Sequence, residues 1–171
     1  AGCERPAVGA ARRGATVSPW FALPKTRLTT SAAHAAPSAK PTTAAGPAFT
    51  VQVGPRAEPA RLYRLPATAT GPAVFFIEHP GYFDRAGLYG EAGSDYPDNA
   101  RRFAFFCRAA LQVLPRVAPG PQVVHAHDWH TSLAPVYLRT LLTGDPYYRR
   151  LTVVLSVHNA GFQGHFPTRT M

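Results

Sequence analysis

The chain has 171 residues, of which 46% are hydrophobic and 16% are charged, and this composition is enough for one domain with a real core. The formal net charge is +9, but no cluster of Arg and Lys with interleaved aromatic residues accompanies it, so we expect no nucleic-acid partner. No apolar run approaches the ~20 residues that a membrane span needs, and two cysteines, Cys3 and Cys107, favour a reducing, cytoplasmic compartment over a disulfide framework.

Residues 1–50 are rich in Ala, Pro, Thr and Arg, and they carry six basic residues against one acidic residue. Such a segment buries too little apolar surface to offset the entropy of ordering it, so we expect a low-complexity leader that is disordered or not native. An acid-poor leader with Arg and Ser also resembles an organelle transit peptide, which would place the protein in a plastid. Translation out of frame upstream of a genuine coding region is a third interpretation, and all three stay open.

The pattern changes at Val51, where we expect the globular part, residues 51–171, to begin. Residues 51–53 and 61–65 alternate with period two, as short strands do. The apolar run 74–77 has the length and continuity of a buried parallel strand.

A long loop dense in tyrosine, glycine and acidic residues then runs to Pro97. Long loops without secondary structure are uncommon in compact domains and are often functional, so Tyr96 is a candidate for stacking on a sugar ring. Asp98 and Asn99 can cap the next helix. The apolar face of this helix consists of Phe103, Phe106, Cys107, Ala110, Leu111 and Leu114. We expect Arg101, Arg102 and Arg108 to lie off this face.

Two more strands, residues 122–126 and 151–157, are expected to be buried, and they bracket a helix that Thr131 or Ser132 can cap. The order strand, helix, strand, helix, strand is typical of βαβ units. The predicted fold class is therefore α/β with a doubly wound parallel sheet. In such sheets ligands bind just beyond the carboxyl ends of the strands.

Polar residues follow the strand at 122–126. His130 lies at the predicted turn from strand to helix, where an imidazole can hydrogen-bond a sugar while the helix N-terminus favours anionic groups. Asp128 and Trp129 precede it. His125 and His127 point the same way on the strand, and we interpret them as half-buried side chains bonded to neighbouring loops.

The next strand is followed by His158, Asn159 and Gly161. An asparagine side chain both donates and accepts hydrogen bonds, which suits hydroxyl groups, and a glycine lets the backbone approach a ligand closely. Because this turn is predicted at the same sheet edge as His130, we include it in the candidate site.

Known motifs for other chemistries are absent or displaced. The spacing H-x-H-D-x-H puts the aspartate one position away from the H-x-H-x-D-H pattern of dinuclear metallohydrolases, so we expect no metal, with a metallohydrolase as an alternative. The sequence contains no G-x-G-x-x-G after a strand, no P-loop and no G-x-S-x-G. No cofactor is therefore expected.

Four segments in order resemble the N-terminal half of bacterial glycogen synthase and plant starch synthase. They read F-F-I-E-H-P-G-Y-F-D-R at 75–85, Y-P-D-N-A-R-R-F at 96–103, V-H-A-H-D-W-H at 124–130 and V-H-N-A-G-F-Q-G at 157–164. The resemblance covers residues 51–167. It implies two Rossmann-like domains that face each other across a cleft, the GT-B architecture, and retaining transfer of glucose from ADP-glucose to the nonreducing end of an α-1,4-glucan.

In that family the residue matching His130 contacts the transferred sugar, so the resemblance implies a catalytic role for His130. It implies that Asp128, Trp129, His158 and Asn159 line the same cleft, and we add Gly161 and Tyr96 as substrate-binding candidates. The implied partners are ADP-glucose and the glucan.

Two departures from the family matter. Its K-T-G-G-L loop near the donor is absent, since Lys25-Thr26 shares only the first two letters. The C-terminal GT-B domain, which the family joins in cis, is also missing from the 171 residues, which read as a fragment. We therefore predict that this chain alone has no transferase activity. The alternatives are another GT-B enzyme that uses a UDP-sugar, and a noncatalytic α-glucan-binding module.

Overall fold

In this computed structural model, the described residues are 20–23, 28–31, 43–66, 72–120 and 123–167. Most of the predicted leader, including Cys3, lies outside them. Three strands fall within residues 1–50, namely β1 (Trp20–Leu23), β2 (Leu28–Ser31) and β3 (Thr43–Ala44). The boundary at residue 50 stays a prediction.

The main sheet has eight strands, in the order β10-β9-β2-β1-β6-β5-β3, with β4 paired to β5 off this path. The remaining strands of this sheet are β4 (Phe49–Val53), β5 (Arg56–Arg64), β6 (Ala73–Glu78), β9 (Val123–His127) and β10 (Thr152–Ser156). Two short strands, β7 (Gly90–Glu91) and β8 (Ser94–Asp95), form a separate hairpin.

The sheet is mixed, in place of the wholly parallel sheet that the sequence predicts. Parallel pairing joins β10 to β9 and β9 to β2, whereas β1 is antiparallel to both β2 and β6. Strands β4, β5 and β6 are joined by short connections, and such connections allow only antiparallel neighbours because a parallel pair needs a long crossover. Strand β1 is antiparallel to both of its neighbours, β6 and β2, so β6 and β2 run in the same direction. Strands β9 and β10 are parallel to β2 and share that direction.

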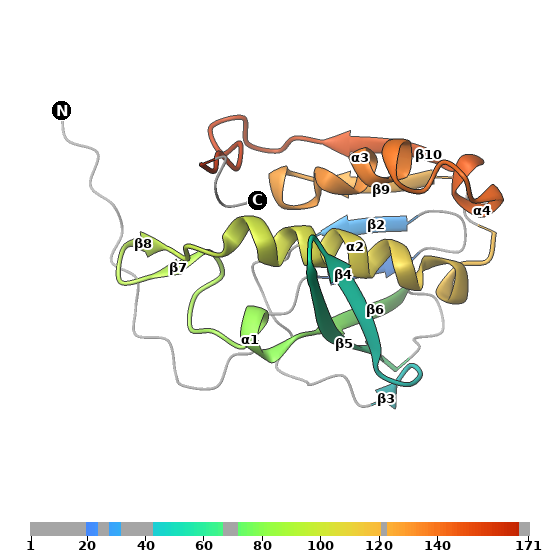
Figure 1. Cartoon of the computed structure of the whole chain (residues 1–171), viewed down its shortest axis with the longest axis horizontal. Helices are drawn as coiled ribbons and strands as arrows, with labels where there is room; N and C mark the ends of the chain where they lie inside the picture. Colours follow the sequence, from blue (N-terminus) through green and yellow to red (C-terminus); the bar gives the residue numbers. More distant parts are fainter. Residues whose placement is uncertain (1–19, 24–27, 32–42, 67–71, 121–122, 168–171) are drawn as a thin grey trace.

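Helix α2 (Asn99–Val117) crosses the middle of the molecule, with β9 and β10 on one side of it and β5 and β6 on the other (Figure 1). All six residues of the predicted apolar face are buried, and Phe105, Ala109 and Val113 are buried with them. The helix packs on β4, β6 and α3 (Leu133–Thr140), which explains why apolar residues cover more than one face. The expectation that Arg102 lies off the buried face is wrong, since this residue is 1% exposed.

Short helices connect the strands. Helix α1 (Pro80–Phe83) follows β6, the 3₁₀ helix η1 (Trp129–Thr131) follows β9, and α4 (Pro146–Arg149) precedes β10. His79 and Asp145 cap α1 and α4 through their side chains. Ser132 is the N-cap residue of α3, but its hydroxyl donates to the carbonyl of Trp129 and leaves the cap without a side-chain bond.

Strand β10 is the edge of the sheet, and the prediction that it is buried is wrong. Val154 and Leu155, which point to opposite faces, are 44% and 42% exposed. No strand pairs with the outer side of β10 among the described residues, although Val153 packs against the hydrophobic core.

Within the same described residues, no helix combines the length and apolarity needed to cross a membrane.

Candidate functional site

The site begins at Asp128, where β9 ends. Its backbone has φ 58° and ψ −178°, a combination that residues other than glycine rarely adopt. The backbone N–H of Asp128 donates to the carbonyl of Ser156 over 2.8 Å, and its carboxylate accepts from the backbone N–H of His158 over 2.6 Å. Asp128 therefore ties the carboxyl ends of β9 and β10 together.

Trp129 packs against aromatic side chains and against a glycine. Its ring centroid lies 4.9 Å from that of Phe103, in an edge-to-face arrangement, and 5.7 Å from that of Tyr89. Gly164 has φ +65°, and a Cβ atom there would lie 2.4 Å from Trp129 Cε3. The segment after β10 thus rests directly on the indole, and only glycine permits that approach.

His130 is 5% exposed and lies in η1, at the turn from strand to helix where the sequence predicts it. Its ring centroid is 5.5 Å from that of Phe103, 5.6 Å from that of Trp129 and 6.1 Å from that of Tyr89. The Cys107 thiol lies 3.5 Å from the carbonyl oxygen of His130, and burial raises the pKa of this thiol to about 12. Three aromatic rings therefore lie near the imidazole.

The turn after β10 is exposed. Asn159 accepts a hydrogen bond from the Gly161 N–H through Oδ1 over 3.0 Å, and its carbonyl accepts from the Phe162 N–H over 3.2 Å. The side-chain NH₂ of Asn159 makes no hydrogen bond to any other described residue. The side-chain NH₂ of Asn159 is therefore available to a ligand, while its Oδ1 and its carbonyl are engaged within the turn.

His125 and His127 are half-buried and bonded across to β10 and the loop after it, as the sequence predicts. His125 Nε2 lies 2.7 Å from Ser156 Oγ, and His127 Nδ1 lies 2.9 Å from His158 Nε2. Burial lowers the pKa of His127, and the neighbouring imidazoles of His125 and His158 lower it further.

Tyr96 is not part of this group of residues. Its hydroxyl accepts from the Gly87 N–H over 3.2 Å, and the Arg85 guanidinium lies 4.7 Å from its ring. Its backbone N–H donates to the carbonyl of Tyr89, which also accepts from the Asn99 side chain. Tyr96 therefore contributes to the site through the backbone of Tyr89.

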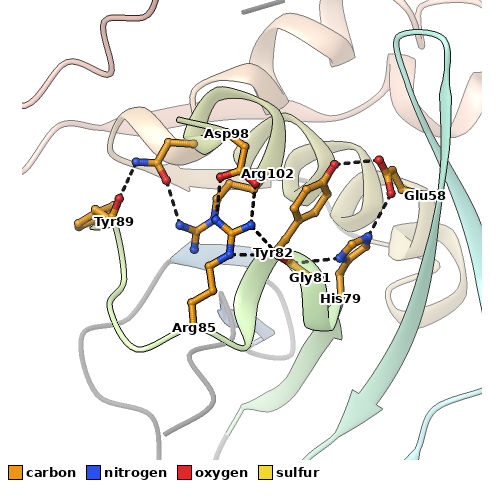
Figure 2. A network of polar contacts seen from close by, with 9 residues as sticks. Glu58, His79, Gly81, Tyr82, Arg85, Tyr89, Asp98 and Arg102 are labelled. Atoms are coloured by element: carbon orange, nitrogen blue, oxygen red, sulfur yellow. Dashed lines mark hydrogen bonds and ion pairs between the residues drawn. The ribbon is translucent and has the colours of Figure 1, made fainter. Parts of the chain in front are cut away.

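An ion pair anchors the same loop, as Figure 2 shows. Arg85 donates two hydrogen bonds to Asp98, of 2.6 and 2.7 Å, and two more to the carbonyl of Gly81. The Arg85 hydrogen bond lowers the pKa of Asp98 although burial acts in the opposite direction. Asp98 occupies the N-cap position of α2 as expected, but its carboxylate binds Arg85 rather than the helix end.

Sequence reasoning missed a second polar cluster, Glu58, His79 and Tyr82, also drawn in Figure 2. Glu58 accepts from Tyr82 Oη over 2.9 Å and pairs with His79 Nε2 over 3.2 Å. His79 Nδ1 accepts from the Tyr82 backbone N–H, which leaves the proton on Nε2 and makes it the donor to Glu58. Burial, followed by the bond to Glu58, raises the pKa of Tyr82 to about 12. No local pattern reveals Glu58, because it lies more than twenty residues before His79 and Tyr82 in the chain.

Arg102 is a buried cation. It donates to Asn99 over 2.9 Å, and its guanidinium lies 4.9 to 5.4 Å from the rings of Phe103, Tyr96 and Phe83. Burial, followed by the charge of Arg85, lowers the pKa of Arg102 to about 10. Aromatic faces attract such a cation, so Arg102 holds the start of α2 against the loop.

Within the described residues, no group of three or more His, Cys, Asp or Glu side chains is arranged to hold a metal ion. The Asp128 carboxylate, which the spacing places one position away from the metallohydrolase pattern, accepts from the His158 backbone N–H.

Comparison with known proteins points to one family. A family described as "Starch synthase catalytic domain" matches residues 11–171. The chain is 47% identical over 98 residues to the glycogen synthase of Syntrophotalea carbinolica, which covers 57% of this chain and 20% of that protein. It is 48% identical over 94 residues to glycogen synthase 2 of Geobacter sulfurreducens, with coverages of 55% and 19%.

Among solved structures, the catalytic domain of starch synthase IV from Arabidopsis thaliana, bound to ADP and acarbose, has a TM-score of 0.55. It is 24% identical in sequence, and the match covers 68% of this chain and 23% of that one. This likeness concerns the mixed α/β fold. The chain spans about a fifth of the length of the curated relatives named above.

Proposed function

Because the chain belongs to the family of starch synthase catalytic domains, we propose that it is part of a glycogen or starch synthase. The reaction is the transfer of glucose from ADP-glucose to the nonreducing end of an α-1,4-glucan, with retention at the anomeric carbon and without a metal. The relatives named above carry the glycogen synthase name, and the Arabidopsis structure was solved with ADP and acarbose, so a nucleotide and a glucan-like ligand suit this family.

One observation carries the proposal. The carboxyl ends of β9 and β10 are bonded together through Asp128, and the segment that follows the His158–Asn159 turn packs on Trp129 at Gly164. An exposed amide and an aromatic ring at this end of the sheet are the two kinds of group that a sugar needs, one for its hydroxyls and one for its apolar face. Gly161 keeps that turn tight.

We assign His130 the catalytic position. Its imidazole lies in η1 beside Trp129, between the strand end and the N-terminus of α3. Positive charge that develops on the transferred glucose would be stabilised by dipoles already fixed around it, because such dipoles need no rearrangement during the reaction. In this assignment the ring of Tyr89, which packs on both Trp129 and His130, bounds the sugar position.

The proposed architecture is the GT-B one. The strands that run in one direction, β6, β2, β9 and β10, would form the Rossmann-like half, which would be part of an N-terminal domain. A second domain in cis would bind the nucleotide. The chain alone is therefore expected to bind glucan without turning over ADP-glucose.

The test is a titration of the purified chain with maltohexaose, followed by NMR. We expect shifts at the Trp129 indole and the Asn159 side chain, and a loss of binding of at least tenfold in Asn159→Ala. His165→Ala is the matched control, because this imidazole is exposed in the same loop and bonds only to Gln163 among the described residues. Equal affinity in both variants would contradict the proposed site.

Two enzyme assays separate the competing functions. Glucosyl incorporation from ADP-glucose by the chain alone would contradict the need for a second domain. In the whole protein, inhibition by UDP but not by ADP would favour a UDP-sugar enzyme, and glucan binding without turnover would favour a noncatalytic binding module.

A further inference from the structure

Strands β9 and β10 carry a row of polar side chains on one face. In their parallel register, Val154 lies opposite His125 and Ser156 lies opposite His127. Each imidazole of β9 reaches two residues past its partner, so that His125 contacts Ser156 and His127 contacts His158. The rings of His125 and His127 are 4.1 Å apart between centroids. Three imidazoles therefore follow one another at the carboxyl edge of the sheet.

The contact between His127 and His158 joins β9 to the turn that carries Asn159. The two rings are nearly parallel, with 11° between their planes and 5.2 Å between their centroids. Beside this contact, the Asp128 carboxylate accepts from the His158 backbone N–H. The start of the turn is thus held to β9 at two points, one through the His158 side chain and one through its backbone.

A hydrogen bond between two imidazole nitrogens depends on how many protons they hold. One nitrogen must donate a proton while the other accepts through its lone pair. Two neutral rings meet this condition, and one neutral ring with one imidazolium meets it with a stronger, charge-assisted bond. When both rings are imidazolium, both facing nitrogens carry protons and two like charges face each other, so the bond is lost.

We propose that His127 is a positioning residue, whose Nδ1 holds the His158–Asn159 turn against the end of β9 and releases it when both imidazoles carry protons. Its consequence for sugar binding rests on the function proposed above, whereas the release itself does not. Neither the sugar nor a second domain takes part in this contact, so it is testable in the chain alone.

The electrostatic surroundings oppose protonation of His127. The titratable groups that face it are His125 from its own strand, Asp128 directly after that strand, and His158 from the loop after β10. Burial is the largest cause that lowers its pKa, the two imidazoles lower it further, and Asp128 opposes them. The folded protein thus binds this proton less readily than the unfolded chain, and stability is lost as the pH falls from about 6.5 through the lowered folded value.

The experiment measures backbone order in residues 158–161 by ¹⁵N relaxation at pH 8 and at steps down to pH 4, because the pKa of His127 is lowered and release needs protons on both rings. In the unmodified chain we expect order parameters to fall from about 0.85 to below about 0.6 at the acid end of this series. The key variant is His127→Asn, because an asparagine amide occupies nearly the place of Nδ1, does not titrate, and can accept from a protonated His158. We expect this variant to stay ordered at pH 4, and His127→Leu to be loose throughout the series.

Matched controls and a separate binding assay complete the design. His165→Asn changes an exposed imidazole of the same loop and should keep the pH response of the unmodified chain. Loosening of His127→Asn at pH 4 to the same extent as the unmodified chain would overturn the proposal, and this comparison holds even if His127→Leu does not fold. Maltohexaose binding at pH 8 is read independently, so an ordered turn that binds no glucan would count against the proposed function alone.

Discussion

The backbone of Asp128 provides a test that reverses an ordinary rule of protein stability. At most positions glycine is less stable than alanine by about 0.5–1 kcal/mol, because its unfolded chain has more freedom. At φ 58° and ψ −178° a side chain costs about 1–3 kcal/mol, and glycine avoids that cost. Asp128→Gly should therefore be more stable than Asp128→Ala by about 1–2 kcal/mol.

The second expected change in the free energy of unfolding comes from the Asp128 carboxylate. It accepts the His158 N–H over 2.6 Å, and a hydrogen bond to a charged group contributes about 1.5–3 kcal/mol, with the lower end fitting a half-buried site. Asp128→Ala loses this bond and keeps the strain, so its free energy of unfolding should fall by about 1.5–2 kcal/mol. Asp128→Asn retains an acceptor oxygen and is the matched control, with a smaller loss.

The assay is urea unfolding followed by far-UV circular dichroism at pH 7, with all variants fitted to one common slope. The reasoning is refuted if Asp128→Gly is less stable than Asp128→Ala by the ordinary glycine difference, because the native turn would then carry no strain. Equal stability of Asp128→Ala and Asp128→Asn would instead show that the bond to His158 contributes nothing.

Three further predictions concern the elements around the site. Arg85 holds the pKa of Asp98 below its ordinary value. The stability that this pair contributes is therefore full above about pH 4 and is lost as the pH falls through the lowered pKa. In Asp98→Asn the urea midpoint should consequently fall less steeply between about pH 4 and lower pH than in the unmodified chain. Gly164→Ala places a Cβ 2.4 Å from Trp129 Cε3 at a positive φ, and should cost about 1–3 kcal/mol and shift tryptophan emission to the red. Phe105→Ala empties a fully buried site in α2 and should lower the free energy of unfolding by about 3–5 kcal/mol in the same urea titration.

Local patterns predicted the elements well where one strong signal dominated. The helical spacing of apolar residues located α2, although the helix extends through Pro115 to Val117. The run at 74–77 located β6, and His130 lies at the predicted turn. These signals depend on residues close in sequence, so they need no knowledge of the partner elements.

Pairings between distant segments were beyond the reach of such patterns. Strands β1 and β2 lie in the segment that composition marks as a leader, yet they separate β6 from β9. The exposure of β10 was missed for the same reason, since a short apolar run such as that of Val153, Val154 and Leu155 has the same pattern in the centre and at the edge of a sheet. Arg102 is buried against three aromatic rings. Phe103 and Tyr96 are close to it in the chain, but Phe83 is not.

The candidate site shows why the position of a motif can be predicted from sequence although the surroundings of its residues cannot. Asp128, Trp129 and His130 are adjacent in sequence, yet they face three different environments: the backbone of the next strand, the glycine at 164, and the aromatic rings beside α2. A left-handed residue at the end of a strand turns the chain abruptly, and it is this turn that separates the three side chains. The geometry of the candidate site therefore depends on a backbone conformation that no residue type in the motif predicts, and replacing Asp128 tests this geometry at its origin rather than at any single contact.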